Sequence, residues 1–137
     1  MRVIAGTYKG RKLESPDSYD IRPTTDKAKE ALFSILMNDI PGARVLDLFA
    51  GSGALGIEAL SRGAAECVFV DHSRQSVALI RRNLAGCAVT EPARVLAGDY
   101  RKVLAGLGGS FDVILMDPPY NQGLLEEAFH QIGRAHV

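Results

Sequence analysis

The stretch that decides the fold is Asp47-Leu48-Phe49-Ala50-Gly51-Ser52-Gly53-Ala54-Leu55-Gly56. Residues 45–49 are largely apolar and predict a short buried strand, and residues 54–62 predict a helix that ends at Gly63. Between strand and helix the glycines follow the pattern G-x-G-x-x-G, which allows a ligand to approach the backbone and the free N–H groups of the helix start. By itself this pattern fits a nicotinamide cofactor as well as other adenosyl ligands.

Strand and helix patterns alternate outward from this stretch. Further strands are predicted at 67–70, 95–97 and 111–116, and further helices at 73–83, about 101–107 and from 124 onward. The alternation predicts an α/β fold with a doubly wound, Rossmann-like parallel sheet. Because only four strands and part of a final helix follow this pattern, we expect the sheet to be truncated on its C-terminal side.

The region before the sheet, residues 1–43, is predicted to hold a small β-hairpin, a linker and a helix. Gly6 and Gly10 lie near the turn of the hairpin, and two prolines interrupt the polar linker at 14–23. Thr24 or Thr25 is expected to cap the helix. The helical spacing predicts a buried face formed by Ala28, Ala31, Leu32, Ile35 and Leu36.

The chain therefore divides into three segments. Residues 1–43 form the N-terminal region, and residues 44–131 form an incomplete α/β domain. Residues 132–137 do not continue the apolar period of the preceding helix, and we expect them to be a non-native tail read through from a sequencing adapter.

Composition and charge describe an ordinary globular domain of 137 residues, 47% of them hydrophobic. The 16 basic and 16 acidic residues cancel, so the overall charge gives no reason to expect a nucleic-acid partner. Residues 1–12 nevertheless contain no acid and carry the basic residues Arg2, Lys9, Arg11 and Lys12. This basic arm could contact phosphates, although a solvated basic terminus has the same composition.

The two cysteines give no metal or disulfide signal. Cys67 lies in an apolar run and is expected to be a small buried hydrophobe, and Cys87 is too far away in sequence for metal-site spacing. We expect no metal. Neither a secretory signal nor a membrane-spanning run is seen, so a cytoplasmic protein is predicted.

Three acids favour S-adenosylmethionine over a dinucleotide. Asp47 precedes the glycines and would attract the methionine ammonium group but repel a pyrophosphate. Asp71 ends the second strand, where an acid can bind ribose hydroxyls, and Asp99 follows the third strand, where it can accept a hydrogen bond from adenine. Each acid also fits a purely structural role: Asp47 and Asp71 as helix caps, and Asp99 as a turn former. The candidate cofactor-binding residues are Asp47, Phe49, Ala50, Gly51, Ser52, Gly53, Asp71, His72, Asp99 and Tyr100.

The last predicted strand ends in Asp117-Pro118-Pro119-Tyr120. Two consecutive prolines cannot continue a ladder, so a carboxylate, a carbonyl and an aromatic ring are left at the carboxyl end of the strand. This set suits a flat substrate with an exocyclic amine, because the ring can stack on a base while the oxygens accept hydrogen bonds from its NH2 group. A plain strand-ending turn that happens to contain a tyrosine would show the same four residues.

With these motifs the chain resembles the class I S-adenosylmethionine-dependent methyltransferases, through D-L-F-A-G-S-G at 47–53 and D-P-P-Y at 117–120. M-R-V-I-A-G at 1–6, K-G-R-K-L at 9–13 and R-P-T-T-D at 22–26 make it similar to the bacterial 16S rRNA guanine-N2 methyltransferase family, which modifies guanine 966. The resemblance implies a catalytic role for Asp117, Pro118, Pro119 and Tyr120, and RNA contacts by Arg22, Thr24 and Thr25 along with the basic arm. It implies a monomer acting on 16S rRNA or a partly assembled small ribosomal subunit.

In the implied reaction the guanine N2 amine would donate hydrogen bonds to Asp117 and to the Pro118 carbonyl, while Tyr120 stacks on the base. A DNA adenine-N6 methyltransferase uses the same tetrapeptide, but the gaps between elements are too short for a large target-recognition insertion. Two further hypotheses compete with methyl transfer to RNA. The glycine pattern also fits a nicotinamide-dependent oxidoreductase, and a truncated chain could be a non-catalytic RNA-binding fragment.

Overall fold

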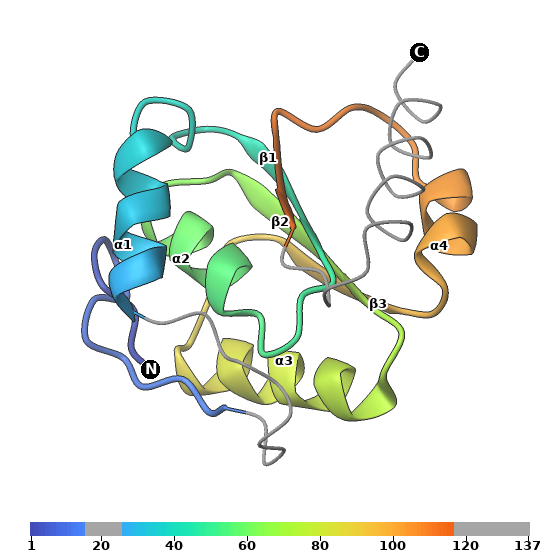
Figure 1. The fold of residues 1–137 in the computed structure, drawn as a ribbon, viewed down its shortest axis with the longest axis horizontal. Helices are drawn as coiled ribbons and strands as arrows, with labels where there is room; N and C mark the ends of the chain where they lie inside the picture. Colours follow the sequence, from blue (N-terminus) through green and yellow to red (C-terminus); the bar gives the residue numbers. More distant parts are fainter. Residues whose placement is uncertain (16–25, 117–137) are drawn as a thin grey trace.

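A parallel sheet forms the centre of the molecule, in a computed structural model that describes residues 1–15 and 26–116 (Figure 1). Its strands follow the order β3-β2-β1-β4, and every neighbouring pair is parallel. The bounds are β1 Arg44–Leu48, β2 Glu66–Asp71, β3 Ala93–Ala97 and β4 Val113–Met116. The predicted parallel α/β fold is confirmed, with strand ends that differ by one or two residues.

Helices cover both faces of this sheet. Their bounds are α1 Asp26–Ile35, α2 Ala54–Ser61, α3 Arg74–Gly86 and α4 Tyr100–Gly106. The first three pack on one face together with the N-terminal residues, and α4 packs on the other (Figure 1). Within the described ranges, no helix combines the length and the apolar character that crossing a membrane requires.

Alternation along the strands divides the core into two layers. Val45 of β1 and Phe69 of β2 point to the face of α1, α2 and α3, whereas Leu46 and Leu48 point to the face of α4. Each of these side chains is fully buried. Strands buried on both faces read as nearly continuous apolar runs, which is why the sequence predicted them well.

Cys67 of β2 lies in the larger layer and is buried, as predicted. Burial raises the pKa of its thiol well above the usual value, and the nearby charge of Asp47 raises it further. The thiol therefore stays protonated and behaves as a small apolar side chain.

The direction of the chain reverses across the sheet at β1. From β1 the chain winds outward to β2 and β3, and then crosses back through α4 to place β4 on the other side of β1. Such a switch point opens a crevice at the carboxyl ends of the strands, where ligands bind in open α/β sheets.

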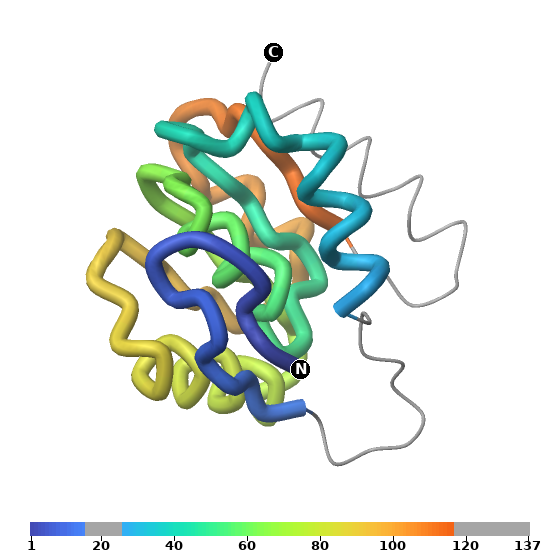
Figure 2. Tube along the Cα trace, turned by 90° about the vertical axis from the view of Figure 1, so that its left-hand side faces the viewer, coloured from blue at the N-terminus to red at the C-terminus, as the bar shows by residue number. Residues whose placement is uncertain are grey.

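Residues 1–15 form an arm that folds back on itself. Arg2 and Lys12 make an antiparallel bridge, and the Val3 N–H donates to the Arg11 carbonyl at 2.9 Å. Gly6 and Gly10 both have left-handed backbones, with φ of +88° and +84°, so the predicted small hairpin is confirmed. Figure 2 shows this arm lying across α2 and descending towards α3.

The predicted buried face of α1 is wrong at three of its five residues and holds at Leu32 and Leu36, which are partly buried against the core. Ile35 is 81% exposed, and Ala28 and Ala31 are exposed as well. The buried residues of α1 are Lys29 and Phe33, one turn apart. Apolar spacing could not identify this face, because one of its two buried residues is a lysine. Lys29 is buried next to the carboxylate of Glu58 in α2.

Candidate functional site

A cavity of about 350 Å³ opens at the carboxyl edge of the sheet, within the size range of small-molecule sites. It is formed by the ends of β1, β2 and β3 and the start of α4. Its lining residues are Phe49, Val70, Asp71, His72, Gly98, Asp99, Tyr100 and Arg101. Five of the predicted cofactor residues, Phe49, Asp71, His72, Asp99 and Tyr100, therefore meet at one site.

The turn after β1 has an unusual backbone. Phe49 and Gly51 both have a φ of +59°, a conformation that glycine adopts freely and that costs energy for phenylalanine. This backbone places Phe49 against the cavity, where its ring meets that of Tyr100 edge-on, with centroids 5.4 Å apart. A Cβ added to Gly51 would meet no atom within 4 Å, so the loop is open at that residue.

Asp71 joins the cavity to the glycine loop. Its carboxylate accepts hydrogen bonds from the N–H of Gly51, at 3.0 Å, and from the N–H of Ser73, at 2.9 Å. A carboxylate has about four acceptor positions, so these two bonds fix its orientation and leave capacity for a ligand hydroxyl. Asp71 is 8% exposed and borders the cavity.

Asp99 also lines the cavity and caps a helix. Its carboxylate accepts a hydrogen bond from the Arg101 N–H at 2.9 Å, at the N-terminus of α4, and its side chain is about half exposed. The predicted turn role of Asp99 therefore coexists with a position at the site. Tyr100 follows directly and is 6% exposed.

Asp47 lies deeper than the cavity. It is 1% exposed, and its carboxylate accepts a hydrogen bond from the Gly56 N–H in the first turn of α2 at 3.0 Å. The predicted helix-capping role of Asp47 matches this contact, and a role toward the cofactor remains a prediction. Gly53 is the N-cap of α2, and its N–H donates to the Ala50 carbonyl at 2.8 Å. The residues that shape the loop behind the cavity without lining it are Asp47, Ala50, Gly51, Ser52 and Gly53.

Residues of two kinds were not among those predicted from the sequence. Val70 and Arg101 line the cavity, and their positions next to Asp71 and Tyr100 could have shown this. Asn83 is 2% exposed and lies three residues after Ile80 on the apolar face of α3. A polar residue on such a face indicates a specific hydrogen-bonding role.

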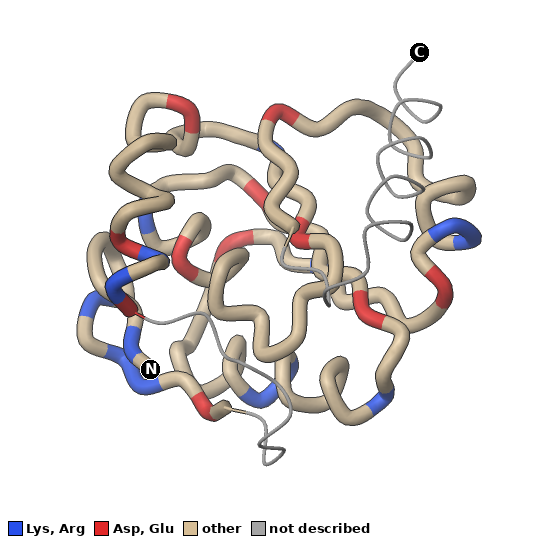
Figure 3. Tube along the Cα trace, in the orientation of Figure 1, with Lys and Arg blue, Asp and Glu red and all other residues tan. Residues whose placement is uncertain are grey.

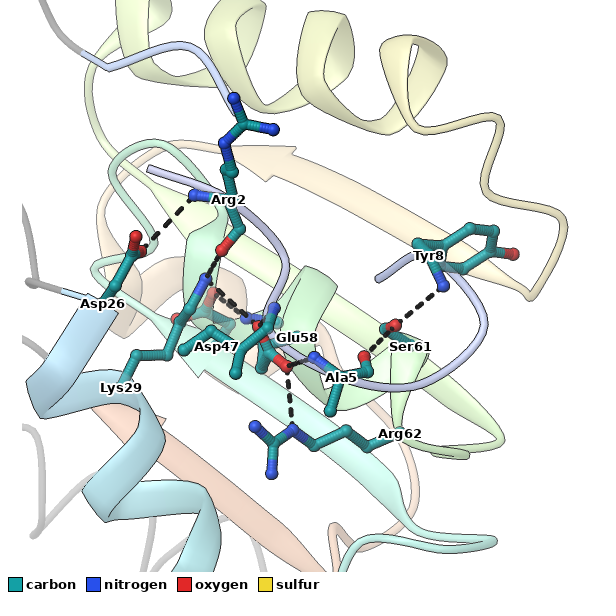
Figure 4. Close-up of polar contacts among 11 residues, drawn as sticks. Arg2, Ala5, Tyr8, Asp26, Lys29, Asp47, Glu58, Ser61 and Arg62 are labelled. Atoms are coloured by element: carbon teal, nitrogen blue, oxygen red, sulfur yellow. Dashed lines mark hydrogen bonds and ion pairs between the residues drawn. The ribbon is translucent and has the colours of Figure 1, made fainter. Parts of the chain in front are cut away.

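A group of charged side chains, with Lys29 and Glu58 fully buried and Arg62 partly exposed, attaches the arm to the fold (Figure 4). Glu58 of α2 accepts hydrogen bonds from the backbone N–H groups of Ile4 and Ala5, at 2.9 and 3.2 Å. The Lys29 ammonium lies 3.1 Å from one oxygen of Glu58, and Arg62 Nε lies 2.8 Å from the other. Lys29 also donates to the Arg2 carbonyl at 2.7 Å, so this cluster ties α1, α2 and the arm together.

A second anchor of the arm lies one turn further along α2. The Ser61 hydroxyl donates to the Ala5 carbonyl at 2.6 Å and accepts from the Tyr8 N–H at 3.0 Å. The Ser61 carbonyl accepts from the Thr7 N–H at 2.8 Å. The arm is therefore a docked element of the fold.

The outer side of the arm carries its positive charge. The side chains of Arg2, Lys9, Arg11 and Lys12 belong to exposed residues, and Figure 3 shows the basic residues of the arm gathered near the N-terminus. The apolar residues Val3, Tyr8 and Leu13 between them are buried. The arm thus has an inner anchored side and an outer basic side.

Several predicted residues lie outside the described ranges: Arg22, Thr24, Thr25, Asp117, Pro118, Pro119 and Tyr120. Across residues 1–15 and 26–116, no cluster of three or more His, Cys, Asp or Glu side chains could hold a metal ion.

The described residues fit an adenosyl ligand. The cavity offers two aromatic rings, an apolar wall at Val70 and a carboxylate oriented by the glycine loop. Asp71 can accept hydrogen bonds from ribose hydroxyls, and Asp99 from an exocyclic amine. The cavity therefore offers aromatic contact for a base and carboxylate acceptors for the ribose hydroxyls and an exocyclic amine.

Comparison with known proteins finds one matching family model and similar sequences. The family model described as "Conserved hypothetical protein 95" matches residues 1–137. "Ribosomal RNA small subunit methyltransferase D" of Escherichia coli (strain K12) is 43% identical over 130 residues, which cover 95% of this chain and 65% of that protein. "Putative rRNA methyltransferase YlbH" of Bacillus subtilis (strain 168) is 43% identical over 129 residues, covering 92% of this chain and 70% of the relative.

A solved structure shares the fold. "Putative methyltransferase yhhF from Escherichia coli" superposes with a TM-score of 0.88 at 40% identity, covering 99% of this chain and 73% of that one. The chain thus spans about two thirds to three quarters of the length of these relatives.

Proposed function

The chain belongs to the family described as "Conserved hypothetical protein 95", and because two similar proteins carry the names of a small-subunit rRNA methyltransferase and a putative rRNA methyltransferase, we propose that it methylates ribosomal RNA. The methyl donor is S-adenosylmethionine, and the acceptor is the exocyclic N2 amine of a guanine in 16S rRNA. The resemblance of the motifs points to guanine 966. The observation that carries the proposal is the cavity bordered by Asp71, whose carboxylate is held by the glycine loop.

The residues of the cavity would hold the cofactor at its nucleoside end. Asp71 would accept hydrogen bonds from the ribose, Asp99 would accept from the adenine amine, and Phe49 would contact the adenine or the ribose with its ring. His72, Tyr100 and the glycine-loop residues 50–53 complete this site, and Asp47 supports the loop from behind. When bound, the sulfonium supplies an activated methyl group.

The substrate would meet the cofactor at the carboxyl ends of β1 and β4. In the proposed reaction Asp117 and the Pro118 carbonyl orient the guanine amine, Pro119 fixes the turn, and Tyr120 stacks on the base. The proton that the amine loses on methylation passes either to Asp117 or to water. Positioning of this kind can supply much of the rate enhancement, because the leaving group is already strong. The outer side of the arm, together with Arg22, Thr24 and Thr25, would contact the RNA backbone.

The partner would be 16S rRNA, either free or in a partly assembled small subunit, and the enzyme would act as a cytoplasmic monomer. Transfer of labelled methyl groups to each of these RNA substrates, followed by nucleoside analysis, tests the proposal. The expected product is N2-methylguanosine. Labelled adenine in DNA, or calorimetric binding of NAD in place of S-adenosylmethionine, would contradict it.

Asp117→Ala in the full-length protein tests the catalytic assignment. Turnover should fall by roughly two decades or more, the usual scale for loss of a positioned polar group, while cofactor affinity stays the same. Tyr120→Ala serves as the companion variant and should chiefly weaken engagement of the base. A parental rate of methylation in Asp117→Ala would show that the assignment is wrong.

A further inference from the structure

One buried side chain joins three separate segments of the molecule. Asn83 of α3 is 2% exposed. Its Oδ1 accepts the Glu14 N–H at 2.8 Å, and its Nδ2 donates to the Glu14 carbonyl at 3.0 Å and to the Ser52 carbonyl at 2.9 Å. Asn83 therefore bonds the end of the arm and the glycine loop at the same time, using its acceptor and both of its donor hydrogens.

Ser52 is connected to the cavity through Gly51 and Asp71. Ser52 follows Gly51, whose N–H is bound by Asp71, and Asp71 borders the cavity. The Ser52 carbonyl thus links the residues beside the cavity to the amide of Asn83. The same amide holds both backbone groups of Glu14.

Core packing does not require a polar residue here. The neighbouring positions on the same helix face are Ile80 and Leu84, and an apolar side chain of similar size would suit that face. The asparagine is needed for the connection between the two segments.

The other hydrogen bonds that hold the arm come from α2 and do not involve the glycine loop. Glu58 and Ser61 both hold the arm from α2, and their hydrogen bonds reach residues 4–8. They provide a matched comparison, because they attach the same arm without touching Ser52.

We propose that Asn83 is a positioning residue that couples occupancy of the cofactor cavity to docking of the arm. The inference rests on the proposed function for the identity of the ligand. Cofactor in the cavity would tighten the Glu14 attachment, and the basic outer side of the arm would then be presented to RNA in a fixed position. By linkage, RNA on the arm would raise cofactor affinity by the same factor.

Hydrogen exchange tests this coupling without RNA. S-adenosylhomocysteine, the reaction product, is added to saturation, and exchange at the Leu13 and Glu14 amides is measured in the full-length protein. The parent should show about fivefold or greater slowing of exchange at these amides, the lower end of typical coupling factors. Asn83→Asp keeps the size and the acceptor oxygen but loses both donors, and should reduce the slowing to less than about twofold.

Two controls separate coupling from general damage. Glu14→Ala removes only an exposed ion pair with Arg82 and should keep the full slowing. Ser61→Ala loosens the arm on α2 and should raise basal exchange in residues 4–8 while keeping the ligand effect at Glu14. If Asn83→Asp does not fold, Asn83→Ala, which removes both donors without adding a charge, should likewise reduce the slowing at Leu13 and Glu14 to less than about twofold.

The second readout is the RNA linkage itself. Affinity for a 16S rRNA fragment is measured with and without S-adenosylhomocysteine, and the ratio should fall to about one in Asn83→Asp. Binding of S-adenosylhomocysteine with no exchange effect in the parent, or a full effect in Asn83→Asp, would overturn this inference alone. Absence of S-adenosylhomocysteine binding to the parent would overturn the proposed function as well.

Discussion

The carboxylates of Glu58 and Asp71 differ in how many of their hydrogen-bond acceptor positions are already used within the fold. Glu58 is fully buried and receives four donors, two from the arm backbone and one each from Lys29 and Arg62. Asp71 receives two backbone N–H groups and borders a cavity. A carboxylate whose acceptor positions are all used within the fold stabilises that fold, whereas one with positions facing a cavity can exchange partners with a ligand.

The largest effect on folding is expected for Glu58→Gln. The variant leaves the Lys29 ammonium buried without a full counter-charge and should lower the free energy of unfolding by about 3–5 kcal/mol, measured in urea. Glu14→Ala is the control, because it breaks an ion pair between exposed side chains, worth about 0–1 kcal/mol. If the two variants unfold at the same urea concentration, the buried cluster does not anchor the arm.

Gly6 and Gly10 offer a matched test of arm docking, since their φ angles are nearly equal. A Cβ on Gly6 would lie 1.9 Å from the Ser61 carbonyl oxygen, whereas one on Gly10 would meet no atom within 4 Å. Both alanine variants carry the same backbone strain. Gly6→Ala should therefore cost about 1–3 kcal/mol more than Gly10→Ala, because only Gly6→Ala overpacks the contact with α2. Equal unfolding midpoints would contradict a docked arm.

Asp71→Ala tests the carboxylate that borders the cavity. Affinity for S-adenosylmethionine, measured by calorimetry, should weaken by about 1–3 kcal/mol, the scale of hydrogen bonds lost in a desolvated site. Asp112→Ala is the control: Asp112 accepts the Arg44 N–H at the amino end of the sheet, away from the cavity. Unchanged affinity in Asp71→Ala would remove Asp71 from the cofactor site.

The difference between Glu58 and Asp71 also shows which features of the fold and of the site could be predicted from the sequence. Strands buried on both faces and glycines at turns predicted the sheet and the cavity edge, because local patterns determine both. Spacing could not show that Lys29 would occupy the centre of the buried face of α1, since its partner Glu58 lies 29 residues away. Nor could it separate Asp47, which accepts the Gly56 N–H behind the glycine loop, from Asp71, which borders the cavity. Acids in similar positions along neighbouring strands differ only in three-dimensional surroundings.

The smallest effect on stability is expected on the outer side of the arm. Lys9, Arg11 and Lys12 are exposed, so their joint replacement by alanine should change the free energy of unfolding by no more than about 0.5 kcal/mol per site. RNA affinity should nevertheless fall, and the slope of its logarithm against the logarithm of salt concentration should flatten by about one unit for each lost phosphate contact. Cofactor affinity measured without RNA should stay at the parental value, because none of these residues lines the cavity. An unaltered salt slope would show that the basic arm is only a solvated surface, and that Glu58 and Ser61 anchor it for stability alone.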